Sequence, residues 1–146
     1  MEFIKQFVFS FFGTIGASIL FSIPRDSIII SGTVGSLGWM TYTFILSKYS
    51  SPVAGTFFGA LAVGIIGELL ARHLKKPATV FIIPGIIPLV PGAGMYYTML
   101  ALIEKRFLDA ANIGTETLFI AVAISIGIVI SSSLGRSIKR VQKKAQ

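Results

Sequence analysis

Long runs of apolar residues alternate with short polar links along this chain. Five runs are long enough to cross the hydrocarbon core of a bilayer as helices, which takes about 20 residues each. They cover residues 4–23, 27–46, 53–71, 78–103 and 117–135. The pattern therefore predicts an all-α integral membrane protein with about five transmembrane helices, organised as a single transmembrane domain over residues 1–146.

The links between the runs are short and leave no room for a soluble domain. They cover residues 24–26, 48–52, 72–77 and 104–116. In the fourth link, Asp109 and Asn112 are expected to cap the chain or face solvent. The first run is longer than the apolar region of a signal peptide and has no clear cleavage site, so we expect a retained membrane helix.

Composition points to the same class of protein. Hydrophobic residues make up 53% of the chain and charged residues 13%, whereas soluble domains carry about 25% charged residues. There is no cysteine for a disulfide or a thiolate, and the one histidine, His73, is too few for a multi-histidine metal site. The chain also lacks a Ser/His/Asp set, a Walker loop, zinc-ligand spacing and a dinucleotide fingerprint. We therefore expect neither an enzyme nor a cofactor or metal.

The net charge of +7 comes from cations between and after the apolar runs, as in membrane proteins, and no nucleic-acid partner is expected. With five crossings, the N-terminus and the second and fourth links carry four of the thirteen Lys and Arg residues, and the opposite face carries nine. The positive-inside rule then places the C-terminus in the cytoplasm. If residues 77–107 instead dipped into the membrane and returned, the division would be seven to six, so five crossings are favoured.

The fourth run is interrupted by the sequence PGIIPLVPG at residues 84–92. Pro84, Pro88 and Pro91 each lack a backbone N–H and clash with the preceding helical turn, so the fourth helix is predicted to be broken. At membrane depth, irregular backbone is tolerated only where it is buried in protein or lines a watery cavity. In transporters such breaks form substrate sites. A structural kink without a ligand is the alternative, and the sequence leaves open whether the segment crosses or re-enters.

Nine residues in and after this break are the predicted substrate-binding set. Backbone amides at the half-helix ends would meet an anionic group of the substrate, and hydroxyl groups on the second half would add polar contacts. For the two tyrosines, anchoring at the membrane interface is an equal alternative. The set comprises Pro84, Gly85, Pro88, Pro91, Gly92, Gly94, Tyr96, Tyr97 and Thr98.

Glu68 is the one acidic residue well inside a predicted span. A carboxylate in hydrocarbon is costly, so it should face a cavity, a partner or a protonation event. We consider Glu68 a candidate for proton coupling or for binding a substrate amine. The alternative is an ion pair with Arg72, four residues further along the same helical face.

Small residues recur at a spacing of four in the first three runs, which lets helix backbones approach closely. Examples are Gly13 with Ala17, Gly32 with Ser36, Gly55 with Gly59, and Ala60 with Gly64. Packing within one chain is the simpler interpretation. A face for a second subunit is the alternative, and the thinness of a five-helix bundle favours a homo-oligomer or a partner.

Residues 77–97, PATVFIIPGIIPLVPGAGMYY, resemble the signature of the threonine/serine exporter family in its small-subunit, two-component form. The resemblance implies a secondary transporter of the bacterial inner membrane, thought to use the proton gradient. It also implies export of threonine and serine, or of a dicarboxylate such as succinate, together with a larger membrane subunit that carries a hydrophilic N-terminal region. This chain shows no such region, so the small subunit is expected. A non-transporting membrane scaffold for a partner protein is the alternative function.

Overall fold

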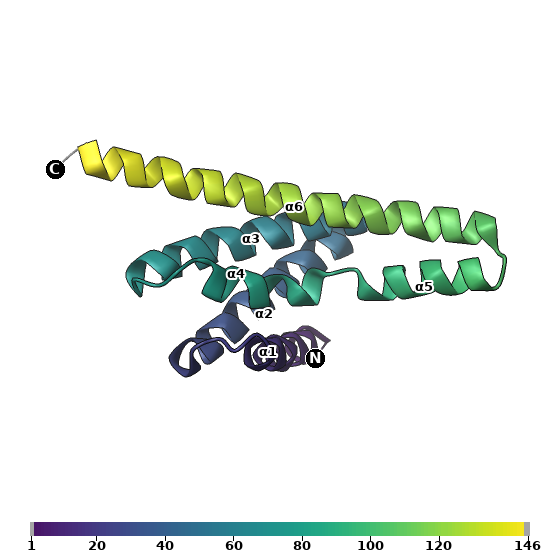
Figure 1. Ribbon diagram of the computed structural model, residues 1–146, viewed down its shortest axis with the longest axis horizontal. Helices are drawn as coiled ribbons and strands as arrows, with labels where there is room; N and C mark the ends of the chain where they lie inside the picture. The colour runs from purple at the N-terminus through teal and green to yellow at the C-terminus, as the bar shows by residue number, and fades with distance from the viewer. Residues whose placement is uncertain (1, 145–146) are drawn as a thin grey trace.

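The computed structural model describes residues 2–144, with side chains described for residues 3–135. All regular structure in these residues is helical (Figure 1). The elements are α1 (Glu2–Leu20), α2 (Arg25–Tyr49), α3 (Pro52–His73), α4 (Thr79–Ile86), the 3₁₀ helix η1 (Ile87–Leu89), α5 (Gly92–Ile103) and α6 (Phe107–Lys144).

The prediction of an all-α membrane protein is confirmed. Within the described residues, α1, α2, α3 and α6 are each long and apolar enough to cross a membrane, and α4–η1 with α5 makes a fifth span if the bent pair counts as one. The two halves of that pair bend by 49°. A re-entrant segment would reverse its direction, whereas these halves run on in the same general direction (Figure 1). The break in the fourth predicted helix, expected from the prolines, is confirmed.

The predicted fourth link was too long. Helix α6 begins at Phe107, so the link shrinks from residues 104–116 to 104–106. Arg106 donates to Glu104 and to Asp109, at 2.6 and 2.8 Å, and these hydrogen bonds raise the pKa of the Arg106 guanidinium above its ordinary value. Asp109 thereby lies in the first turn of α6, where a carboxylate suits the positive end of the helix dipole. Asn112 is an exposed residue of this helix rather than of a loop.

The turn from α2 to α3 is two residues long because its residues match what each helix end needs. Ser50 ends α2 in the left-handed region, with a φ of 51°. Ser51 caps α3, since its Oγ accepts the N–H of Ala54 at 3.3 Å. Pro52 follows in the first turn, where its missing N–H removes no helical hydrogen bond.

Helix α3 is the centre of the bundle, and its small residues face its neighbours. A Cβ at Gly59 would lie 3.1 Å from Leu89 of η1, and one at Gly67 would lie 2.7 Å from Ile82 of α4. A Cβ at Gly64 would overlap the side chain of Ser131 of α6. The interpretation as packing within the chain is thus confirmed for α3.

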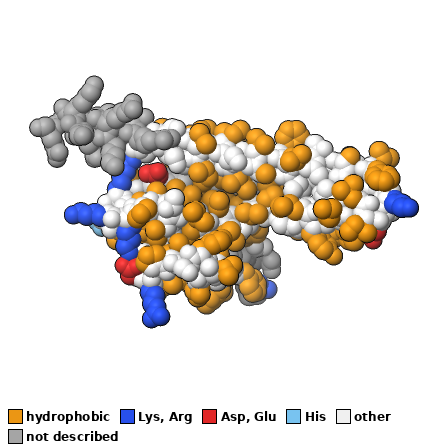
Figure 2. Space-filling view, in the orientation of Figure 1, with side chains coloured by type: hydrophobic (Ala, Val, Ile, Leu, Met, Phe, Trp, Pro, Cys, Tyr) orange, Lys and Arg blue, Asp and Glu red, His pale blue; other side chains and the backbone are white. Residues whose placement is uncertain are grey.

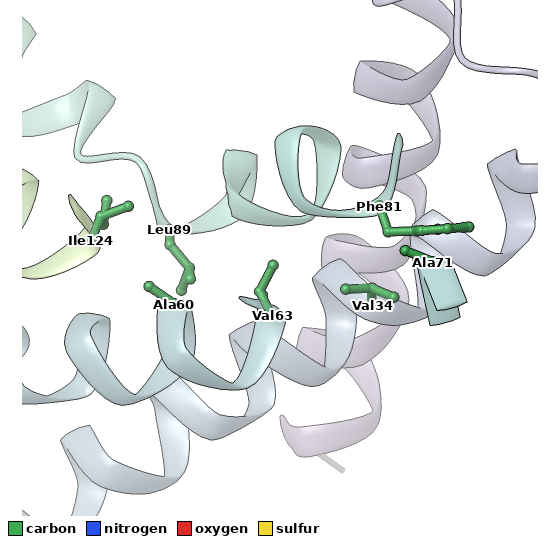
Figure 3. Close-up of a cluster of buried hydrophobic side chains, with 7 residues drawn as sticks. All are labelled: Val34, Ala60, Val63, Ala71, Phe81, Leu89 and Ile124. Atoms are coloured by element: carbon green, nitrogen blue, oxygen red, sulfur yellow. The ribbon is translucent and has the colours of Figure 1, made fainter. Parts of the chain in front are cut away.

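A buried apolar cluster fills the space between α2, α3, α4 and α6 (Figure 3). Phe81 is its largest fully buried side chain. The cluster comprises Val34, Ala60, Val63, Ala71, Phe81, Leu89 and Ile124.

Helices α5 and α6 form an antiparallel hairpin that projects from the bundle (Figure 1). Gly94 of α5 packs on Thr117, and Gly114 of α6 packs on Thr98. Further along α6, Gly127 packs on α3 at Ala60. The first turns of α6 and all of α5 therefore lie beyond the N-terminal end of α3.

Replacing Gly64 by alanine should lower the free energy of unfolding by about 1–3 kcal/mol, because overpacking a close helix contact forces backbone or side-chain shifts. The new Cβ would lie 2.6 Å from the Cβ of Ser131. Thermal unfolding of the purified protein in detergent measures the effect.

Gly16→Ala is the matched control, because no atom outside its own helix lies within 4 Å of the added Cβ. It should be neutral or slightly stabilising. Adding Ser131→Gly to Gly64→Ala should recover much of the loss. Wild-type stability of Gly64→Ala alone would contradict the packing described.

Candidate functional site

The prolines break the fourth crossing without leaving most of its backbone unbonded. Short turns replace the lost helical bonds: the Ile87 N–H donates to the Pro84 carbonyl, and the Val90 N–H donates to the Ile87 carbonyl at 3.2 Å. The Gly92 N–H then donates to the Val90 carbonyl at 2.8 Å. These bonds satisfy the break from within, so that the adjacent helices need not supply polar partners.

The start of α5 is the exception. Pro91 precedes the helix and offers no side-chain cap, and the first helical bond runs from the Met95 N–H to the Pro91 carbonyl at 3.1 Å. Within the described chain, the amides of Ala93 and Gly94 donate to no carbonyl or side chain. Such amides at the positive end of a helix dipole are suited to an anion.

The first two predicted residues of the site are core residues. Pro84 and Gly85 are buried. A Cβ at Gly85 would lie 2.9 Å from Val63 and 3.2 Å from Val34. This glycine therefore lets α4 approach α2 and α3 closely, and it holds the break in place rather than facing a cavity.

Pro88 lines a cavity of about 230 Å³ beside the break. Its other walls come from Ile87 of η1, from α1 and from α2. Two polar side chains meet there, because the Trp39 Nε1–H donates to the Gln6 Oε1 at 2.7 Å. The cavity is lined by Gln6, Phe9, Ser10, Gly13, Trp39, Ile87 and Pro88.

Gln6 and Trp39 are not among the residues predicted from sequence. Both residues could have been noticed because they are rare. Gln6 is the one amide side chain in the first apolar run, and Trp39 is the one tryptophan of the chain. Nothing in the spacing of these residues shows that they meet.

The hydroxyl-bearing residues after the break lie away from this cavity. Tyr96 and Tyr97 are 63% and 54% exposed, and their rings meet edge to face at 5.3 Å. The Thr98 hydroxyl donates to the Gly94 carbonyl at 2.7 Å. Of the predicted set, Pro88 lines the cavity, and Gly92 and Gly94 lie in the first turn of α5.

Glu68 lies in a second cavity, of about 160 Å³, between α3 and α6. Arg72 donates to the backbone carbonyl of Gly135, and Glu68 Oε2 would lie 2.8 Å from a Cβ at that glycine. Among the described side chains, Glu68 and Arg72 do not form the ion pair considered as the alternative. Because Gly135 has no side chain, the surface of α6 leaves room at this point for both charged groups.

The two cavities share no residue. Leu89, next to Pro88, packs on α3 at Gly59. Glu68 follows Gly59 by nine residues, or about 14 Å along the helix axis. Glu68 and the cavity at Pro88 are therefore separate sites at different depths.

Polar contacts fix the start of α4 at the end of the bundle nearest Glu68. Lys76, in the link before α4, pairs with Asp26 and donates to the Ser27 hydroxyl at 2.7 Å. The Ser31 hydroxyl donates to the Val80 carbonyl at 3.1 Å. These bonds attach α4 to α2 and so position the break that follows.

Residues 6–134 match the family model described as "Threonine/Serine exporter". The chain belongs to the threonine/serine exporter family. A threonine/serine exporter of Corynebacterium glutamicum is 31% identical over 115 residues, which cover 79% of this chain and 23% of that protein. A Haemophilus influenzae protein named as uncharacterized is 25% identical over 134 residues, which cover 89% of this chain and 45% of that protein. No solved structure matches the chain.

The exporter-family chain thus spans less than half the length of these two relatives. Family membership and the apolar helices together identify a multi-pass membrane protein. The matched residues include the whole break and both cavities except Gly135.

The start of α5 should be reachable by water, because open amides at membrane depth need polar surroundings. The chain has no cysteine, so the labelling of a single-cysteine variant comes from the introduced residue. Ala93→Cys should react with a water-soluble maleimide, whereas Leu89→Cys, at a position that is 5% exposed, should not. Equal protection of both cysteines in native membranes would contradict an aqueous path to the break.

Proposed function

We propose that this chain is one membrane subunit of a secondary transporter that exports a small carboxylate-bearing metabolite, either threonine and serine or a dicarboxylate such as succinate. The observation that carries the proposal is the start of α5, where open amides follow the proline break. Half-helices of this kind bind anionic substrate groups in transporters. Family membership supports the same function.

The substrate carboxylate binds the amides of Ala93 and Gly94. The dipole of α5 adds a partial positive charge at this point. Gly92 and Ala93 are exposed, and nothing lies within 4 Å of where a Gly92 Cβ would be, so the backbone is open to an approaching ligand. The small residues at the start of α5 thus have a role beyond packing.

Glu68 carries the proton in this proposal. Its cavity is separate from the one at Pro88, which argues against Glu68 holding the amine of a substrate bound at the break. Ile65, Leu69 and Leu134 line this cavity together with Glu68 and Arg72, and acidic residues inside membrane spans are typical of proton relays.

A larger membrane subunit completes the transporter. The exposed faces of the α5–α6 hairpin carry large apolar side chains, among them Met99 and Phe119. Within the described chain, α5 packs mainly on α6, whereas α6 also packs on α3. Relatives in the family are more than twice as long as the matched region. Association of two copies of the chain is an alternative way to cover the hairpin.

The chain lies in the bacterial inner membrane with its C-terminus in the cytoplasm. Lys and Arg side chains gather at the end of the molecule where α3 leads into α4, and fewer lie at the α5–α6 turn (Figure 2). The positive-inside rule supports the orientation in which the richer end is cytoplasmic.

Efflux from loaded cells tests the proposed function. Cells that contain the chain together with its larger partner should export labelled threonine, serine or succinate, and an uncoupler should stop the export. Cells with either protein alone should not. Background efflux of all three compounds from cells with both proteins would overturn the proposal.

Glu68→Gln should reduce proton-driven efflux by about tenfold or more, which corresponds to at least about 1.4 kcal/mol. Glutamine keeps the size of the side chain but cannot exchange a proton. Downhill exchange of labelled for unlabelled substrate should persist, because it needs no net proton movement.

Glu116→Gln is the matched control, since Glu116 is exposed on α6 and lines neither cavity. It should leave efflux within about twofold of wild type. An equal loss of efflux and exchange in Glu68→Gln would indicate a role in substrate binding or folding and would exclude the proton assignment.

A further inference from the structure

Arg72 does not take the partner that its position in the helix offers. Glu68 lies four residues earlier on the same face of α3, and a carboxylate is the partner that a guanidinium bonds most strongly. The Arg72 guanidinium instead donates to the backbone carbonyl of Gly135 in α6. A carbonyl oxygen has a second lone pair for such a donor, besides the one used within its own helix. This arrangement is the one expected when the Glu68 carboxyl group is neutral.

The two side chains are close enough for Arg72 to change its partner. The Glu68 Oε2 and the Arg72 Nη2 lie 2.8 and 3.2 Å from the same point, which is the position that a Cβ at Gly135 would occupy. A rotation of the Arg72 side chain therefore moves its guanidinium from the carbonyl to the carboxyl group without a change in the backbone of α3.

Within the described chain, no other charged or titratable side chain lines the cavity at Glu68 and Arg72. Its remaining walls are aliphatic and hydroxyl side chains of α3 and α6 and the glycine of α6. Helix α4 also packs on α3 but contains no charged residue. The charged and titratable groups of the adjoining segments are Arg25, Asp26, His73, Lys75 and Lys76, together with Arg136, Lys139 and Arg140 of α6, whose side chains lie outside the described residues.

Helix α6 links this contact to the start of α5. Gly127 packs directly on the backbone of α3, where a Cβ would lie 2.9 Å from the Phe57 carbonyl oxygen. Gly135 lies eight residues, or about 12 Å, beyond Gly127. Thr117, which packs on Gly94 of α5, lies ten residues, or about 15 Å, before it. A pivot of α6 at Gly127 therefore moves its two ends in opposite directions, and α5 moves with α6 because the proline break separates it from α4.

We infer that Arg72 is a positioning residue that couples the proton on Glu68 to the substrate site at α5. This inference rests on the proposed function, in which Glu68 carries the proton and the α5 amides bind the carboxylate. While Glu68 is protonated, Arg72 holds α6 through the Gly135 carbonyl. When Glu68 gives its proton to water, Arg72 turns to the new carboxylate, α6 pivots at Gly127, and the α5 amides move with it. The binding of the proton and the binding of the substrate carboxylate then influence each other.

Distances between two spin labels on the full chain in lipid nanodiscs test the inference. One label is attached at Ser47→Cys, an exposed position in the last turn of α2, and the other at Leu108→Cys, which is 82% exposed in the first turn of α6. Leu108 lies about 28 Å from Gly127, so a helix shift of about 1–2 Å at Gly135 becomes about 2–5 Å at Leu108. Every variant also carries His73→Gln, which removes the one histidine of the chain because imidazole titrates within the pH range used.

The distance should change by about 2–5 Å between acidic and alkaline pH. Glu68→Gln should keep the acidic distance and Arg72→Gln the alkaline one, at every pH. Arg72→Lys keeps the cation and should respond to pH with a smaller amplitude. Arg25→Gln is the control, because Arg25 is an exposed cation that lines neither cavity, and it should respond as the chain with Arg25 does.

A distance that does not change with pH would overturn the inference. An unaltered response to pH in Glu68→Gln or in Arg72→Gln would overturn it as well. Should Arg72→Gln fail to fold, the responses of Glu68→Gln and Arg72→Lys decide the question.

Efflux measurements separate this inference from the proposed function. A distance that responds to pH through Arg72, without efflux in the presence of the larger partner, would uphold the role of Arg72 beside Glu68 and reject transport. Uncoupler-sensitive efflux that is unchanged in Arg72→Gln would uphold transport and reject the role of Arg72.

Discussion

The need to bond every backbone polar group at membrane depth governs this structure. Three prolines remove backbone N–H donors from the fourth predicted span. Short turns through Ile87, Val90 and Gly92 replace the lost helical hydrogen bonds. The turns alone do not hold the break in position. Gly85 brings it against α2 and α3, and Leu89 continues that contact onto Gly59. The amides of Ala93 and Gly94 are left open because Pro91 provides no side-chain cap at the start of α5.

The contacts that hold the break in position also explain where the two cavities lie. Close packing through glycines brings α4 onto α2 and α3, so no space remains on that side of the break. On the other side, η1 lies against α1 and α2, and the larger side chains of these helices do not fill the space between them. The cavity lined by Gln6 and Trp39 remains there. Glu68 lies instead beside Gly135 of α6, where the absence of a side chain leaves room for it. The cavity at Pro88 thus lies between α1, α2 and η1, whereas the cavity at Glu68 lies between α3 and α6.

Features that depend on local sequence were predictable, and features that depend on contacts between helices were not. Apolar length predicted the spans, and the prolines predicted the break. The start of α6 at Phe107 was missed because Asp109, Asn112 and Glu116 suggested a loop, whereas they are solvated positions of a helix whose first turn is secured by Arg106. Gln6 and Trp39 are 33 residues apart, and no periodicity within either helix predicts that they meet. Glu68 was selected because it is an acidic residue inside a predicted span, but its neighbour Gly135 in α6 was not foreseen.

The first turns of α6 bear on how the chain sits in lipid. Helix α6 carries Asp109, Asn112 and Glu116 near its start, and the uncharged residues 117–135 that follow extend about 28 Å. The 22 residues of α3 extend about 33 Å. A hydrocarbon core of about 30 Å therefore matches both helices. The first turns of α6 then extend into the polar headgroup layer, which widens the bilayer to about 40–45 Å.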